Sequence, residues 1–290
     1  MAEPVFRDRD AWATIRGYFY QIQITIQRWM DLEPGEELRL ECGEDIDRVG
    51  RALCENGTAS EQLLLEQVKH REKHLTLRSP EALAALTCFH CHRVANPQVR
   101  LRFRYVTNAS VGREATSQMP GGVPAIEAWE RLRLGSFAPR EEGGALGGIR
   151  SVLSTVPKPA GVREDDWEAL RQFIRAADNT ELLGLVRSVE WGTGTTSFEL
   201  MESKIQQQLV ETGRAASSEE SHSLYLRLVL FVLKRLSASG PKSLVPENLD
   251  GVISAPGLGS ADSRLLRMIE LLLVSETASS KDIREIGVCT

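Results

Sequence analysis

Residues 61–70 read EQLLLEQVKH, and this stretch is the strongest sequence signal for the fold. Three consecutive leucines in a short apolar run indicate a buried β-strand. Side chains alternate along a strand, so Gln67 and Lys69 share one face while Glu66 points to the other. The strand therefore combines a buried core with two polar side chains placed side by side.

The residues around this strand predict an α/β core. Apolar residues at three- and four-residue steps predict a helix over residues 10–30, and Ser79-Pro80 begins a second helix that reaches residue 94. Alternating or apolar runs predict strands at residues 37–45, 47–53, 61–70 and 99–107. This order of elements is typical of a mixed sheet flanked by helices.

The pattern changes near residue 150. Two Gly/Pro-rich stretches, at residues 120–124 and 139–148, surround a short helix at 126–134, and residues 156–161 resemble a linker. Helices are predicted at residues 165–177, 180–189, 198–212, 217–236 and 263–275. We therefore expect residues 1–150 to form the α/β core and residues 151–290 to form an all-α helical domain for assembly or partner binding.

The helix at residues 217–236 is apolar around much of its circumference. Leu224, Leu228, Phe231 and Leu236 do not fall into one narrow stripe once Val232 is included. Burial at the centre of the chain's own bundle explains this pattern, and so does burial against another subunit.

Composition narrows the class of protein. With 42% apolar and 26% charged residues among 290, the chain has a soluble globular composition. A net charge of −5 excludes a uniformly basic surface for nucleic acid, although a local basic patch is compatible with it. No apolar run is long enough to span a membrane, and the first residues lack a secretory h-region. Five cysteines without an export signal predict reduced thiols and a cytoplasmic location.

Two short motifs have explanations other than cofactor binding. Cys88-Phe-His-Cys91-His92 matches the covalent haem-attachment pattern, but that attachment requires export. A zinc knuckle needs a second ligand pair at suitable spacing, which the sequence lacks, so packing of an amphipathic helix is the preferred interpretation. The run from Gly192 to Gly194 resembles part of a phosphate loop but lacks the complete motif, and it predicts a turn.

The most informative polar residues are Glu41, Asp45, Gln67 and Lys69. If residues 37–45 form one strand, alternation places Glu41 and Asp45 on the same face. If that strand lies beside residues 61–70, two carboxylates, an amide oxygen and an ammonium group meet. Such oxygen ligands suit Mg²⁺, with Mn²⁺ as a substitute, and a lysine beside the metal can orient water or stabilise phosphate charge. A salt-bridged sheet surface would use the same residue types.

Three motifs carry a family resemblance. They are Gly17-Tyr-Phe-Tyr20-Gln21, Glu41-x-x-Glu-Asp45-Ile46 and Gln67-Val-Lys69-His70. In this order of elements they resemble the PD-(D/E)xK-type double-stranded DNA endonucleases of bacterial anti-phage defence. That family includes the nuclease domain of CBASS effectors, STAND NTPase fusions and HerA-associated systems. The resemblance covers about residues 10–135 and implies a restriction-endonuclease-like core.

The resemblance implies a role for each matching residue. Asp45, Gln67 and Lys69 would be catalytic, and Asp45, Glu41 and Gln67 would bind the metal. Four further residues would contact DNA, namely Gln21, His70, Arg71 and Lys73. The glutamine at position 67 keeps an oxygen ligand without a charge, so Asp45 becomes the chief metal carboxylate.

The implied activity is metal-dependent hydrolysis of double-stranded DNA by a defence effector. Cutting both strands usually requires two sites, so we expect a homo-oligomer. The sequence has no complete Walker A motif. The resemblance therefore implies control by a HerA-like or STAND-type NTPase partner in trans, or by a further segment of a longer protein. The main alternative is a catalytically weak nuclease fold that serves as a DNA-binding or scaffolding subunit, and an RNA-directed nuclease is a third possibility.

Overall fold

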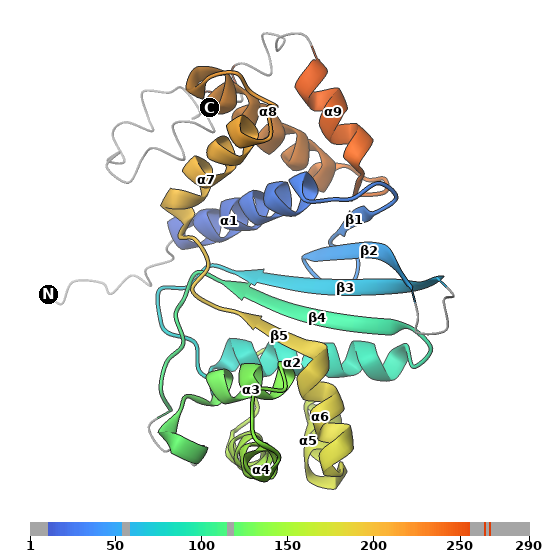
Figure 1. Cartoon of the computed structure of the whole chain (residues 1–290), viewed down its shortest axis with the longest axis vertical. Coiled ribbons are helices and arrows are strands. Elements are labelled where there is room, and N and C mark those ends of the chain that lie inside the picture. The colour runs from blue at the N-terminus through green and yellow to red at the C-terminus, as the bar shows by residue number, and fades with distance from the viewer. Residues whose placement is uncertain (1–10, 54–58, 115–118, 256–263, 265–266, 268–290) are drawn as a thin grey trace, which may run out of the picture.

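A mixed six-stranded sheet runs through the middle of the computed structural model, which describes residues 11–53, 59–114 and 119–255 together with residues 264 and 267 (Figure 1). The strand order is β5-β4-β3-β2-β1-β6. The strands are β1 Glu37–Leu40, β2 Ile46–Leu53, β3 Ala59–Lys69, β4 Arg100–Thr107, β5 Val189–Gly192 and β6 Ser243–Leu244. β3, β4 and β5 run parallel, and the other neighbouring strands pair antiparallel. The predicted mixed sheet flanked by helices is confirmed.

Helices cover both faces of this sheet. α1 Ala11–Met30, α7 Phe198–Glu211, α8 Ser218–Ser237 and α9 Pro246–Ser254 lie on one side (Figure 1). α2 Pro80–Ala95, α3 Ala125–Arg133, α4 Pro139–Thr155, α5 Glu164–Ala176 and α6 Asn179–Ser188 lie on the other, with the short 3-10 helix η1 Pro120–Gly122. No helix in the described part of the chain combines the length and the apolar character needed to cross a membrane.

Each face of the sheet has its own hydrophobic core. On the α2 side, Phe89 stacks on Phe103 with ring centroids 4.8 Å apart. There Trp129 is fully buried, and its Nε1 donates to the carbonyl oxygens of Val186 and Val189. On the α1 side, buried apolar residues of α1 pack with α7, α8 and α9. Burial of whole aromatic side chains on both faces fixes which face each strand residue occupies.

Two predicted boundaries are wrong. The strand expected over residues 37–45 ends at Leu40, because Glu41 adopts a left-handed backbone conformation with φ of 53° and residues 41–45 form bends. The Gly/Pro-rich stretch expected at residues 139–148 belongs to α4. Pro139 occupies the first turn of that helix, where proline is tolerated, and Leu146 and Ile149 bury its apolar face.

Residues beyond 150 supply both edge strands of the sheet. β5 follows α6 directly and pairs with β4, and β6 pairs with β1. The expectation that this half is all-α is therefore wrong in these two places, although it is otherwise helical. The domain boundary at residue 150 stays a prediction, and both hydrophobic cores draw residues from each side of it.

Two further expectations concern the last third of the chain. α8 is buried within its own chain against α1, α7 and α9, which accounts for its broad apolar surface. The helix expected at residues 263–275 lies outside the described residues except for Arg264 and Arg267. α9 and β6 were not predicted from the sequence.

Candidate active site

Asp45 and Lys69 meet where the turn of residues 41–45 reaches the end of β3. Asp45 Oδ2 accepts a hydrogen bond from the Val68 backbone amide at 2.8 Å and lies 3.4 Å from Lys69 Nζ. The Asp45 side chain is 23% exposed and that of Lys69 is 45% exposed. The structure thus brings together two of the three predicted catalytic side chains at a position that solvent and a substrate can reach.

The local strand register explains this meeting. β2 begins at Ile46, which is paired with Glu66, so β3 continues for three residues beyond the last β2 partner. The Val68 amide lies in that extension and would otherwise have no partner on the β2 side. The Asp45 carboxylate accepts that amide hydrogen in place of a strand carbonyl. An acid at the start of β2 is therefore fixed by the backbone of β3.

Gln67 is oriented by a residue that the sequence did not single out. Its amide nitrogen Nε2 donates to Glu44 Oε2 at 3.1 Å, so its amide oxygen faces away from Glu44. Alternation along a strand of residues 37–45 would put Glu44 on the face opposite Asp45. Residues 41–45 form bends instead, so alternation does not apply there. The polar run Cys42-Gly-Glu-Asp45 was the available signal for a turn at this point.

Glu41 has a different partner from the one expected. Its carboxylate forms an ion pair with Lys242, which precedes β6, and its backbone amide donates to the Asp45 carbonyl oxygen at 3.3 Å. The argument that Glu41 and Asp45 share a strand face is wrong because the strand ends before either residue. The role of Glu41 as a metal ligand stays a prediction, and binding there would require release from Lys242.

Two opposing effects act on the Asp45 carboxyl group. Burial raises the pKa of Asp45, and this exceeds the lowering by the Lys69 charge and the Val68 amide. The neighbouring Glu44 raises the Asp45 pKa further. A divalent cation beside Asp45 would favour the ionised carboxylate, because opposite charge at short range lowers an acid's pKa.

Glu66 points to the other face of β3, as alternation predicted. Its side chain is 0% exposed and accepts from Arg28 Nε, with both carboxylate oxygens 3.0 Å away. Arg104 Nη1 lies 3.4 Å from the same carboxylate, and Arg104 also pairs with Glu190. Glu66 is thus a buried structural acid between two arginines, whereas Gln67 and Lys69 face the opposite way.

The four predicted DNA-contact residues lie in different environments. Arg71 is only 11% exposed and donates to Glu81 at 2.6 Å, so it holds the end of β3 to α2. His70 packs edge-on against Tyr20 and Phe198. Lys73 is exposed and Gln21 is half-buried on α1. Lys73 has the greatest exposure of the four, and all four DNA contacts stay predictions.

The turn at residues 192–194 lies beside this end of the sheet. Gly194 has a φ of 63° and donates its amide to Ala109, and Thr195 donates its amide to Thr107, the β4 partner of Lys69. The hydroxyl groups of Thr195 and Tyr20 are hydrogen-bonded. The predicted turn is therefore confirmed, and it connects α1, β4 and the start of α7.

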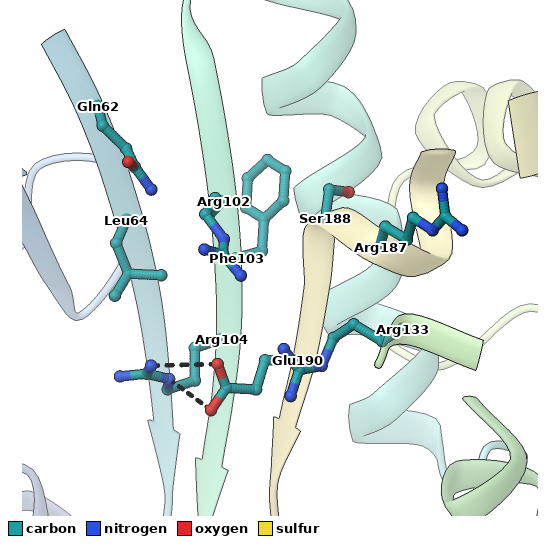
Figure 2. Close-up of a pocket in the computed structure, with 9 residues that line it drawn as sticks. All are labelled: Gln62, Leu64, Arg102, Phe103, Arg104, Arg133, Arg187, Ser188 and Glu190. Atoms are coloured by element: carbon teal, nitrogen blue, oxygen red, sulfur yellow. Dashed lines mark hydrogen bonds and ion pairs between the residues drawn. The ribbon is translucent and has the colours of Figure 1, made fainter. Parts of the chain in front are cut away.

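A small basic hollow of about 90 Å³ lies beside β4 and β5 (Figure 2), where strand residues such as Arg104 and Glu190 meet residues of α3 and α6. Its lining includes four arginines from β4, α3 and α6, namely Arg102, Arg104, Arg133 and Arg187. Figure 2 shows Arg104 joined to Glu190 across neighbouring strands. Gln67 and Lys69 face the other side of β3, so the hollow is separate from the Asp45–Lys69 pair.

Comparison with solved structures found Cap4 receptors that contain a SAVED/CARF domain. One from Acinetobacter baumannii has a TM-score of 0.47 and 15% identity, over 86% of this chain and 47% of that one. One from Moraxella osloensis has a TM-score of 0.42 and 13% identity, over 76% of this chain and 43% of that one. A second Acinetobacter baumannii structure, with the cyclic trinucleotide 3'3'3'-cAAA, has a TM-score of 0.41 and 13% identity, over 98% of this chain and 48% of that one. This chain spans about half the length of each. No protein-family model matches the sequence, and no curated protein matches it.

Proposed function

We propose that this chain is a metal-dependent endonuclease that hydrolyses phosphodiester bonds of double-stranded DNA. One observation carries the proposal: Asp45 and Lys69 lie 3.4 Å apart at the end of β3, with Gln67 two residues before Lys69 on the same strand face. A carboxylate from the turn before β2, together with an amide oxygen and an ammonium group from β3, provides the groups needed for metal-assisted attack of water on phosphate. The motif resemblance described above points to the same chemistry.

The donor atoms fit a hard divalent cation. Asp45 offers a partly exposed carboxylate. The amide nitrogen of Gln67 donates to Glu44, so the amide oxygen of Gln67 faces away from Glu44 and has no hydrogen bond to it. Mg²⁺ retains several waters and is often held by only one or two carboxylates together with substrate phosphate, so a small protein ligand set is sufficient. When bound, the ion would polarise the phosphate and lower the pKa of a bound water.

The side chains of this chain then have separate tasks. Asp45 binds the cation and is itself positioned by the Val68 amide. Gln67 contributes an uncharged oxygen. Lys69 holds the attacking water or stabilises the negative charge that develops on the phosphate. Mn²⁺ would replace Mg²⁺, because both favour oxygen ligands in octahedral geometry.

We further propose that the activity serves anti-phage defence. This part rests on the resemblance of the three sequence motifs to defence endonucleases. It includes a homo-oligomer that supplies two active sites for the two DNA strands, and control by a HerA-like or STAND-type NTPase.

One observation favours the alternative of a catalytically weak, DNA-binding or scaffolding subunit. Glu41 is paired with Lys242 and Gln67 is uncharged, so Asp45 is the only carboxylate of the predicted metal set that contacts the catalytic lysine. A single carboxylate gives weaker cation binding than two. The two functions differ in whether bound DNA is cut.

The deciding experiment incubates the full chain with supercoiled plasmid in Mg²⁺, Mn²⁺ or EDTA, alongside a structured RNA. The endonuclease proposal expects nicked and linear DNA in either metal, intact DNA in EDTA and intact RNA. Retarded but uncut plasmid in both metals would support the scaffolding alternative. Preferential loss of RNA would change the proposed substrate.

A further inference from the structure

Cys88, His92 and Glu44 converge between α2 and the turn of residues 41–45. Cys88 and His92 are four residues apart on α2, so their side chains lie on the same helix face. Glu44 reaches that face from the turn. One ligand atom from each residue, a sulfur, an imidazole nitrogen and a carboxylate oxygen, lies within 4.8 Å of the other two.

The buried carboxylate of Glu44 indicates that this cluster could hold a cation. The Glu44 side chain is only 6% exposed, and its Oε2 accepts from Gln67. Its other oxygen, Oε1, is buried without a hydrogen-bond partner among the described residues and lies 3.6 Å from His92 Nε2. A buried carboxylate oxygen is costly to leave without a hydrogen bond, so a cation at this point would satisfy it.

We propose that Glu44 Oε1, Cys88 Sγ and His92 Nε2 bind one zinc ion, with water as the fourth ligand. A thiolate and an imidazole favour Zn²⁺ over Mg²⁺, which prefers oxygen ligands alone. Glu44 comes from the turn, and Cys88 and His92 come from α2, so two elements supply three protein ligands. A water molecule completes the four-coordinate tetrahedral geometry of zinc. This site is distinct from the pair formed by Asp45 and Lys69.

Zinc binding would replace protons that the cluster holds without metal. Burial and the neighbouring Glu44 raise the pKa of the Cys88 thiol, and the nearby Glu44 carboxylate raises the pKa of His92. The ion displaces the Cys88 thiol proton and the proton on His92 Nε2, and His92 gives up its contact with the Gly43 carbonyl at 3.1 Å. One Zn²⁺ therefore enters as up to two protons leave.

The consequence is structural. Glu44 contacts Gln67 through one carboxylate oxygen and the Cys88/His92 pair through the other. A zinc ion would link α2 to the turn that contains Asp45. It would also hold Gln67 in place through Glu44. The zinc site does not depend on the proposed nuclease activity.

The test uses the metal-free full chain, prepared with a chelator and then dialysed against Zn²⁺. Metal content is measured by mass spectrometry, and Co²⁺ is used as a probe because a cobalt–thiolate bond gives a charge-transfer absorption band. We expect one zinc per chain and a thiolate band that disappears in Cys88→Ser. Cys88→Ser, His92→Gln and Glu44→Gln should each weaken zinc binding by about 100-fold or more, since losing even a residue that only supports a ligand costs 10–100-fold.

Cys91→Ser is the matched control, because Cys91 lies on the same helix but interacts with Asp166 of α5. It should keep the full zinc content and the cobalt–thiolate band. Circular dichroism in metal-free buffer verifies that each variant is folded, and a variant that fails this check is replaced by Cys88→Ala or His92→Phe. Absence of stoichiometric zinc in the wild type, or equal loss in Cys91→Ser and Cys88→Ser, would overturn the proposal.

Discussion

Glu66→Gln should strongly destabilise the fold, and the expected size follows from its two arginine partners. The wild-type carboxylate is fully buried, accepts from Arg28 at 3.0 Å and lies 3.4 Å from Arg104. Removing one partner of a buried ion pair typically costs 3–5 kcal/mol, because the remaining charge is left uncompensated. Arg104 keeps its ion pair with Glu190 at 3.0 Å, so only Arg28 loses its charged partner. We therefore expect a loss of unfolding free energy of about 3 kcal/mol, at the lower end of that range.

Urea unfolding followed by tryptophan fluorescence measures this loss. Glu190→Gln is the control, because Glu190 is 28% exposed and Arg104 would retain Glu66, which predicts a cost of about 1 kcal/mol or less. A Glu66→Gln protein within about 1 kcal/mol of the wild type would refute the buried network. Folded Glu66→Gln should keep DNA cleavage, so a stable but inactive variant would place β3 out of register by one residue.

Three further predictions concern the turn, α4 and α2. Gly43→Ala should cost about 1–3 kcal/mol and reduce cleavage, because the new Cβ would lie 3.1 Å from Asp47 Oδ2 and 3.2 Å from Leu65 Cδ2. A Cβ added at Gly147 in α4 would have no atom within 4 Å, so Gly147→Ala should stabilise the protein by about 0.5–1 kcal/mol. Equal thermal unfolding shifts in Gly43→Ala and Gly147→Ala would contradict the crowding argument. Burial lowers the pKa of His90, so the unfolded chain binds the proton more readily and the contribution of His90 to stability should fall as pH drops through about 6.5. His90→Phe should reduce that fall in pH-dependent urea unfolding, and an unchanged pH profile would exclude His90 as its source.

The sheet could be predicted from sequence where strands are long enough to show a pattern. Leucines and polar residues along β3 identified its core, and alternation correctly separated Glu66 from Gln67. β5 and β6 have only four and two residues, which is too short for a period to appear. α4 was missed because its glycines suppressed the helix signal, although burial of Leu146 and Ile149 stabilises it.

The candidate site could be predicted only in part, because it depends on the backbone conformation at Glu41 and on the packing of α2 beside the turn. Asp45 and Lys69 were predicted together, and the structure places them in contact. Glu44 was missed because the left-handed conformation of Glu41 ends β1 and starts a turn that alternation cannot describe. The convergence of Glu44 with Cys88 and His92 depends on how α2 packs beside the turn, and no sequence spacing reports that contact.

Comparison of Lys69→Met with Lys73→Met in Mg²⁺-dependent plasmid cleavage tests the central claim most directly. Both variants remove one exposed ammonium group near the end of β3, but only Lys69 contacts Asp45. We predict that Lys69→Met lowers the cleavage rate at saturating DNA by about 10²–10³, as loss of a transition-state contact does. Lys73→Met removes a predicted DNA contact, so it should weaken DNA binding and change the rate at saturating DNA far less. Wild-type cleavage by folded Lys69→Met, or an equal loss in both variants, would contradict catalysis at the Asp45–Lys69 pair.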